Sequence, residues 1–145
     1  MNIWIMIRVS GIIALLFFGY GLLRGAGCDY RFHGVNDQLK SHVNIQCHQA
    51  RMSGELVSHS GEPILTFEGW LFSYSETYFY LYLRDVDAHV ATNLPNAKLK
   101  GFSLYENTSL LQGNIQVKDN NEAVVMFYRP ERYTSKGRIL GRVEW

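Results

Sequence analysis

The chain has two cysteines, Cys28 and Cys47, and both follow an apolar N-terminal segment. In an oxidising compartment they would form one disulfide, which closes a loop of roughly 20 residues and stabilises the fold by about 3 kcal/mol. That bond would tie the exit of the apolar segment to the first strand of the domain. Two unpaired thiols are the alternative, with Cys47 buried as a small hydrophobe and Cys28 near the membrane. We favour the disulfide.

Metal binding would be a third use of these thiols, because His33, His42 and His48 lie near them in the sequence. However, the chain has no C-x-x-C or H-x-x-x-H spacing. Adjacent residues of a strand also point to opposite faces, which would separate the side chains of Cys47 and His48. We therefore expect no metal site.

Catalytic signatures are missing, since no G-x-S-x-G, H-E-x-x-H, P-loop or dinucleotide fingerprint occurs. His59 lies between two serines and near Glu62, but neighbours in a turn cannot converge as the members of a triad must. Asp85 and Asp87 could act as paired carboxylates, although a solvated strand end explains them better. We expect no enzymatic activity, no catalytic residues and no cofactor.

The first 27 residues form an apolar segment that could cross a membrane. Val9–Leu23 carries no charge, Ile3–Ile7 is also apolar, and Arg8 and Arg24 are the only cations. A membrane span needs about 20 apolar residues, so Val9–Leu23 alone suits a signal peptide. Counted from Ile3, with Arg8 reaching the headgroups, the segment is long enough to remain in the bilayer.

Three fates of this segment stay open: a retained anchor, a cleaved signal and lipidation. Gly25-Ala26-Gly27 offers the small residues that a signal peptidase needs before Cys28. A small residue before a cysteine also hints at a lipoprotein, although Gly25 stands where such motifs usually carry Leu. Arg8 favours a cytoplasmic amino terminus and Arg24 weakly opposes it. We favour a single-pass inner-membrane anchor, with the C-terminal domain in the periplasm.

The rest of the chain is almost neutral. Without Arg8 and Arg24, 12 Lys and Arg stand against 13 Asp and Glu. Such a domain lacks the positive footprint that grips a phosphate backbone. A mild basic concentration between Arg129 and Arg142 is better explained as a solvated strand face. We therefore expect no nucleic-acid partner.

Residues 28–42 are polar and predict a juxtamembrane linker or short helix, and residues 43–145 predict a β-rich domain. Alternating apolar residues begin at Val43, in a strand that continues towards Met52 and resumes at Leu56-Val57. Further strands are expected at Ile64–Tyr74, Tyr78–Asp85, Leu99–Tyr105, Leu110–Lys118, Ala123–Tyr128 and Gly137–Trp145. The predicted fold class is mainly β: an N-terminal transmembrane helix, then an antiparallel meander of six or seven strands, barrel-like or sandwich.

Gly69, inside the strand Ile64–Tyr74, predicts a bulge or a close approach of two backbones. Alternation places Trp70 on the face opposite Leu65 and Leu71, and it places Tyr78, Tyr80 and Tyr82 in one half-exposed row on the next strand. Such aromatic residues dominate interface energetics, so these four are candidates for a partner or ligand surface. The alternative is that about half of them complete a small core.

Several segments resemble the FidL-like membrane proteins of enterobacteria. They are Asn44-Ile45-Gln46-Cys47-His48-Gln49-Ala50, Gly54-Glu55-Leu56 and Phe67-Glu68-Gly69-Trp70-Leu71, preceded by one membrane segment and an early cysteine. The resemblance implies a protein encoded beside a membrane-bound transcriptional activator with a winged-helix cytoplasmic domain. It contributes no functional residues.

These observations predict a non-enzymatic, membrane-tethered periplasmic accessory protein, and the resemblance implies that its partner is a membrane-bound winged-helix regulator. A periplasmic binding module for a small apolar ligand is the alternative, as is a secreted or lipidated envelope protein. The tether, the cysteine pair and the neutral β-domain suit all of them.

Overall fold

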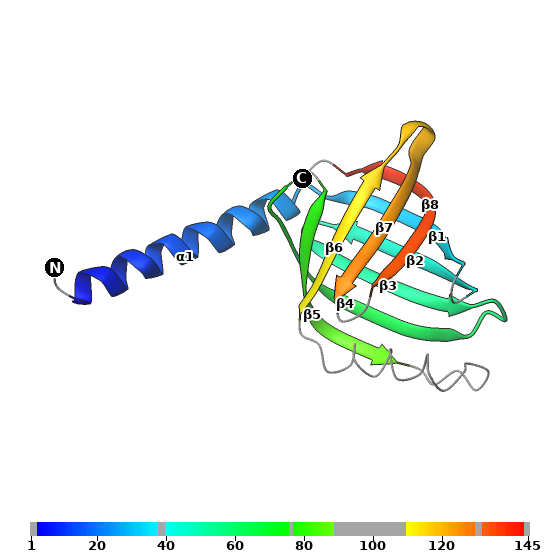
Figure 1. The fold of residues 1–145 in the computed structure, drawn as a ribbon, viewed down its shortest axis with the longest axis horizontal. Coiled ribbons are helices and arrows are strands. Elements are labelled where there is room, and N and C mark those ends of the chain that lie inside the picture. Colours follow the sequence, from blue (N-terminus) through cyan, green and yellow to red (C-terminus); the bar gives the residue numbers. More distant parts are fainter. Residues whose placement is uncertain (1–2, 38–39, 76, 89–109, 130–131, 144–145) are drawn as a thin grey trace.

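The computed structural model describes residues 3–37, 40–75, 77–88, 110–129 and 132–143. It begins with one unbroken helix, α1 (Ile3–Gly25), which projects from a β-barrel (Figure 1). No proline occurs in the helix, and Arg8 does not interrupt it. By length and composition α1 could cross a membrane, a test that a signal sequence also passes. Turn hydrogen bonds from the amides of Gly27 and Cys28 end it, at 3.2 and 3.1 Å.

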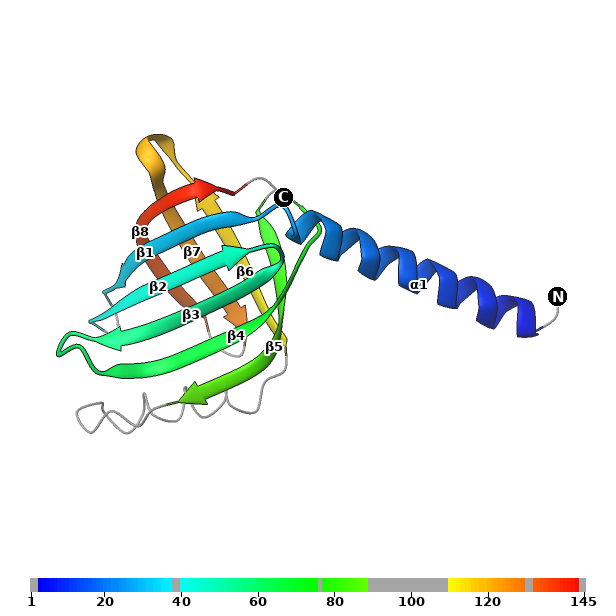
Figure 2. The ribbon, with the colours of Figure 1, turned by 180° about the vertical axis from the view of Figure 1, so that it is seen from behind.

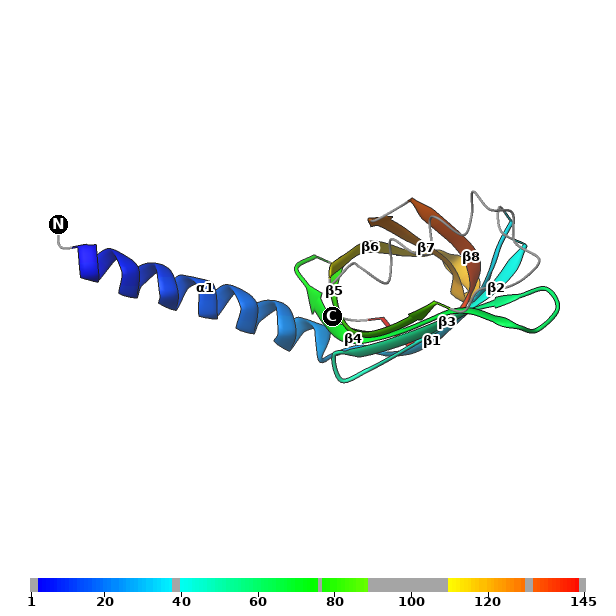
Figure 3. The same cartoon turned by 90° about the horizontal axis from the view of Figure 1, so that it is seen from below.

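In the part of the chain that the structure describes, eight antiparallel strands follow α1 and close into a barrel. They are β1 (Asp29–Asn36), β2 (Ser41–His48), β3 (Arg51–Ser58), β4 (Pro63–Ser73), β5 (Tyr78–Ala88), β6 (Leu110–Val117), β7 (Glu122–Arg129) and β8 (Tyr133–Arg142). Each strand pairs with the next, and β8 pairs with β1. Figure 2 shows β1 to β4 side by side on one wall, and Figure 3 shows β6, β7 and β8 on the opposite wall.

The structure corrects the expected strand count and decides between barrel and sandwich. The expected linker or short helix is wrong for Asp29–Asn36, because this segment is the first strand of the barrel. The expected strand running from Val43 towards Met52 is two strands, β2 and β3. Gln49 and Ala50 form the tight turn between them, with φ of 48° and 63°. The expected strand Leu99–Tyr105 lies outside the described residues.

The interior of the barrel is filled by every second side chain, as the alternation in the sequence predicts. Its largest fully buried side chains are Tyr30, Phe32, Met52, Ile64, Leu71, Phe79, Leu81, Leu111, Ile115 and Val125, together with the polar Asn36 and Asn114. Phenylalanine rings also cover inward-facing glycines: Phe67 lies over Gly54, and Phe79 over Gly113. A Cβ at either glycine would collide with that ring, so each pair acts as one packing unit.

The expected disulfide joins Cys28 and Cys47, whose Cα atoms lie 5.7 Å apart. Cys28 follows directly after α1 and Cys47 points into the barrel from β2, and both residues are buried. The amide of Gln49 also donates to the carbonyl oxygen of Cys28, at 3.2 Å. The exit of the helix is therefore held to the β2–β3 end of the barrel by a covalent bond and a hydrogen bond.

Replacing both cysteines by alanine should lower the free energy of unfolding by about 3 kcal/mol. The reason is that the unfolded chain is then no longer closed into a loop between two residues 19 positions apart, and so gains conformational entropy. Urea unfolding of the full chain in detergent micelles, followed by circular dichroism, measures the change. A reductant should shift the wild-type midpoint towards that of the variant and leave the variant unmoved. Equal midpoints without reductant would contradict the prediction.

Two tyrosine side chains are removed from water by the barrel: Tyr30 is buried and Tyr133 is half-buried. Burial raises the pKa of Tyr133 to about 12, while its hydrogen bond with Ser41, at 3.5 Å, lowers it in part. Burial also raises the pKa of Tyr30. A phenol whose folded pKa lies above its unfolded value, about 10, stabilises the fold fully below that value. This contribution is lost as the pH rises towards the folded pKa.

The free energy of unfolding should therefore fall between about pH 10 and pH 12, and Tyr133→Phe should remove part of that slope. Urea unfolding at a series of alkaline pH values measures it. Tyr82→Phe is the matched control, because this tyrosine is 53% exposed on the outer wall. An identical slope in Tyr133→Phe and wild type would count against the assignment.

Candidate functional site

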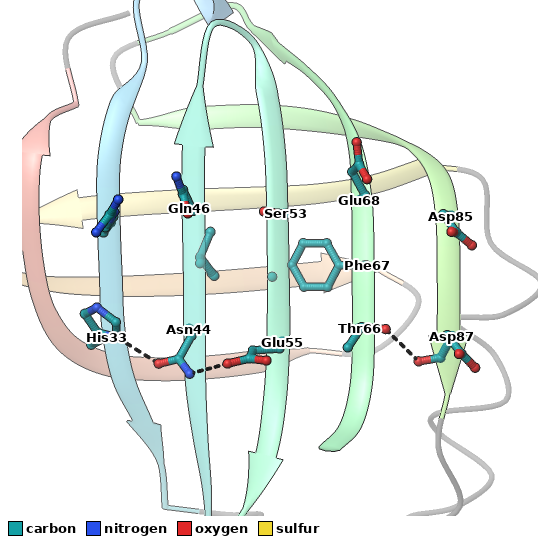
Figure 4. Close-up of a pocket in the computed structure, with 13 residues that line it drawn as sticks. His33, Asn44, Gln46, Ser53, Glu55, Thr66, Phe67, Glu68, Asp85 and Asp87 are labelled. Carbon is teal, nitrogen blue, oxygen red and sulfur yellow. Dashed lines mark hydrogen bonds between the residues drawn. The ribbon is translucent and has the colours of Figure 1, made fainter. Parts of the chain in front are cut away.

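The outer face of β1 to β5 is hollowed into a groove of about 390 Å³, which we call the polar groove (Figure 4). Pockets of this size, roughly 300 to 1,000 Å³, hold small molecules or protruding side chains. Its polar and charged lining residues are Arg31, His33, Asn44, Gln46, Ser53, Glu55, Thr66, Glu68, Asp85 and Asp87. They come from five consecutive strands, two residues from each, because the outward positions alternate along every strand.

A bulge in β5 turns the carboxylates of Asp85 and Asp87 towards the polar groove. Glu68 pairs with Asp85 but Gly69 pairs with Leu83, so Arg84 is the extra residue. The extra residue reverses the alternation: Tyr82 faces outward before it, and Asp85 and Asp87 face outward after it. A Cβ at Gly69 would collide with the carbonyl oxygen of Tyr82, which is the close backbone approach expected at this glycine. The bulge, the alternative that Gly69 predicted, lies opposite it in β5.

Charge is divided across the polar groove. Arg31 and His33 line it on β1, while the carboxylates line it on β3, β4 and β5. The carboxylates belong to Glu55, Glu68, Asp85 and Asp87. Figure 4 shows Asp85 and Asp87 together on β5, at the opposite side of the groove from His33. The acidic side therefore presents a negative surface to any molecule in the groove, and a positively charged group suits it best.

A chain of hydrogen bonds crosses three strands at one end of the groove. Asn44 lies between His33 and Glu55, with His33 Nδ1 at 2.8 Å from Asn44 Oδ1 and Asn44 Nδ2 at 2.7 Å from Glu55 Oε1 (Figure 4). The amide nitrogen of Asn44 donates to the carboxylate, so its oxygen accepts from the imidazole. His33 therefore carries a proton on Nδ1 in this arrangement.

The four aromatic candidates lie on the outer wall of β4 and β5, as the alternation predicts. Trp70 and Tyr82 are register neighbours, and the guanidinium of Arg51 lies 5.0 Å from the centre of the Trp70 ring. Tyr80 pairs with Phe72 across the same two strands. Tyr78 instead stacks on Tyr128, at 6.3 Å between ring centres. The structure thus places three candidates together and directs the fourth towards β7.

Tyr80 and Tyr82 belong to a second hollow, of about 310 Å³, that we call the aromatic rim. It lies between the last part of α1 and the outer wall of the barrel. It is lined by Phe17, Phe18, Phe72, Tyr74, Tyr80, Tyr82 and Leu110. These lining residues include no charged side chain, in contrast to the polar groove.

Inside the barrel, the cavity between Leu56, Phe67 and Phe127 measures about 40 Å³. Drug-sized ligands occupy roughly 300 Å³ or more. Within the part of the barrel that the structure describes, this cavity is too small for a drug-sized ligand.

The remaining candidates are dispersed or engaged in the fold. Cys28 and Cys47 are joined to each other, and within the described ranges no group of three His, Cys, Asp or Glu residues could hold a metal ion. The ring of His42 stacks near that of His59, at 6.2 Å between centres. His48 Nδ1 lies 3.3 Å from Asp29 Oδ1. The three histidines near the cysteines in the sequence thus have different partners: His33 bonds to Asn44, His42 stacks near His59 and His48 lies beside Asp29.

Sequence reasoning missed most of the polar groove. The sequence indicates Asp85 and Asp87 only as a carboxylate pair or a solvated strand end, and it does not mark the outward residues of β1 to β3 as a site. The signal available was the polar half of each alternating strand. Every strand with one exposed face has such polar positions, so they do not mark a site by themselves. Only the order in which the strands pair shows which of them lie side by side on one wall.

Comparison with protein-family models and with curated proteins gives no match to this chain. The resemblance to the FidL-like proteins therefore remains a prediction. The functional proposal below is therefore based on the geometry of the barrel, the polar groove and the aromatic rim.

We predict that His33 holds the Nδ1–H tautomer at neutral pH and that Asn44→Ala abolishes this preference, because the accepting oxygen is then lost. Nitrogen-15 NMR of the imidazole in the full chain distinguishes the two tautomers. Gln46→Ala is the control, since it removes another outward amide from the same strand. A preference that survives Asn44→Ala would disprove the hydrogen-bond assignment.

Proposed function

We propose that this protein is a non-enzymatic accessory protein of the bacterial inner membrane. In this proposal α1 is the retained anchor, and the barrel lies in the periplasm, where its polar groove binds a segment of a membrane-bound protein. The membrane-bound winged-helix regulator implied by the FidL resemblance is the partner that we propose.

The observation that carries the proposal is the contrast between the interior and the outer wall of the barrel. The interior is packed with apolar side chains, and the described cavity there is about 40 Å³, whereas the polar groove on the outside measures about 390 Å³. This contrast favours a barrel that acts through its surface over one that encloses an apolar ligand.

The disulfide supports the periplasmic location. Cys28–Cys47 is buried and lies directly after α1, and such bonds persist in oxidising compartments. A cleaved signal or a lipidated Cys28 would also deliver the barrel there, but lipidation requires a free Cys28 thiol. The disulfide thus favours the anchor or the cleaved signal over the lipoprotein.

The charge of the groove indicates what the partner segment should carry. Glu68, Asp85 and Asp87 form its acidic side. A lysine or arginine of the partner would meet these carboxylates, while Arg31 could contact a carboxylate of the same segment. A periplasmic loop with mixed charge is therefore the binding segment that we propose.

Photo-crosslinking in intact cells tests the function. A benzoylphenylalanine at Gln46, in the groove, should give a crosslink to a membrane protein with a winged-helix domain, and the same group at Val117 should not. Glu68→Lys combined with Asp85→Lys should abolish the crosslink by reversing the charge. Equal crosslinking from both positions, or no effect of charge reversal, would refute the proposal.

A further inference from the structure

The aromatic rim fixes α1 against the barrel. The ring of Phe17 stacks on that of Tyr74, with centres 4.4 Å apart and planes at 11°, and Phe18 meets Phe72 edge-on at 6.2 Å. Gly21 makes room for this contact, because a Cβ there would collide with the Tyr74 ring. At the end of the helix, a Cβ at Gly25 would likewise collide with the carbonyl oxygen of Leu71. The last third of α1 therefore lies against the outer wall of the barrel.

This packing sets how deep the rim would lie in a bilayer. Phe17 precedes Gly25 by eight residues, which corresponds to about 12 Å along the helix axis. The whole helix of 23 residues is about 34 Å long, and the hydrocarbon core of a bilayer is about 30 Å thick. A spanning α1 thus ends only a few ångströms beyond that core. Tyr74, at the level of Phe17, would lie beneath the headgroups.

We infer that the aromatic rim is a membrane-contact surface of the barrel, seated among lipid headgroups and the upper acyl chains. This inference rests on the retention of α1 in the membrane, as proposed above. Tyrosine suits this depth, since its ring is apolar and its hydroxyl can reach the headgroups. Tyr82 and Leu110, at 53% and 48% exposure, are the rim residues that lipid would cover.

Lipid is the occupant because the rim is continuous with the membrane-facing surface of α1. Phe17 and Phe18 line the rim and are also 57% and 59% exposed on the helix itself. Arg24 lies beside Tyr20, with its guanidinium 5.8 Å from the ring centre, at the level where headgroup phosphates are expected. The barrel would therefore lean against the bilayer on its β4–β5 wall.

Fluorescence quenching by brominated lipids tests this contact in the full chain, reconstituted in vesicles of phosphatidylcholine and phosphatidylglycerol. The bromine atoms are placed near the headgroup end of the acyl chains. Single tryptophans are introduced by Leu110→Trp or Val117→Trp after Trp4, Trp70 and Trp145 have been changed to Phe. The two positions are matched at 48% and 49% exposure, and lie at opposite ends of β6, about 23 Å apart.

We expect brominated lipid to remove roughly half of the Leu110→Trp fluorescence and to leave the Val117→Trp fluorescence unchanged. The reason is that side chains at the membrane interface are buried by about 5 to 10 Å, which brings them close to the bromine atoms. Tyr82→Trp should behave as Leu110→Trp, and it replaces that reporter if the latter fails to fold. Equal quenching of the two β6 reporters, or quenching of neither, would overturn the inference. If the introduced tryptophans are not quenched but their emission changes with the number of protein molecules per vesicle, a second copy of the chain covers the rim instead of lipid.

A chain that keeps only Trp4 separates this inference from the proposed function. Quenching of Trp4 together with unquenched rim reporters would reject the membrane contact and leave the anchor intact. Unquenched Trp4, or a purified protein lighter than the full-length 16.7 kDa, would reject the retained anchor and with it the inference.

Discussion

The pairing of β8 with β1 is the contact on which the rest of this structure depends. It joins the last strand of the chain to the first, so that neither remains an open edge. Two glycines of β8 make the approach possible, because a Cβ at Gly137 or Gly141 would collide with the carbonyl oxygen of His33 or Asp29. At Gly141 the backbone also adopts φ of +107°, which favours glycine. The disulfide holds the start of β1 to β2, on the other side of β1 from this seam.

Closure divides the side chains into a packed interior and an exposed wall. One bulge then decides the character of that wall. Before Arg84 the outward residues of β5 are tyrosines, and after it they are carboxylates. A single extra residue therefore separates the aromatic rim from the acidic side of the polar groove. Val86 moves to the core side by the same change of alternation.

The two hollows suit two different neighbours. The polar groove carries charges of both signs and opens on the wall of β1 to β5, whereas the aromatic rim lies where α1 meets the barrel. The helix is held there by ring stacking and by the disulfide that follows it. An anchor fixed in this way restricts how the barrel can rotate above a membrane. In our proposal, this restriction keeps the groove accessible to a partner in the same membrane.

The sequence by itself determined the apolar helix, the cysteine pair, the antiparallel β class, the inward and outward faces of β4, and those of β5 as far as Leu83. These features depend on local composition and on alternation with a period of two, which neighbouring residues express directly. Tertiary structure alone decided that eight strands close into a barrel. The polar segment Asp29–Asn36 became a strand because β2 and β8 pair with both of its sides. The groove and the rim likewise depend on which strands lie side by side, and no local pattern records that order.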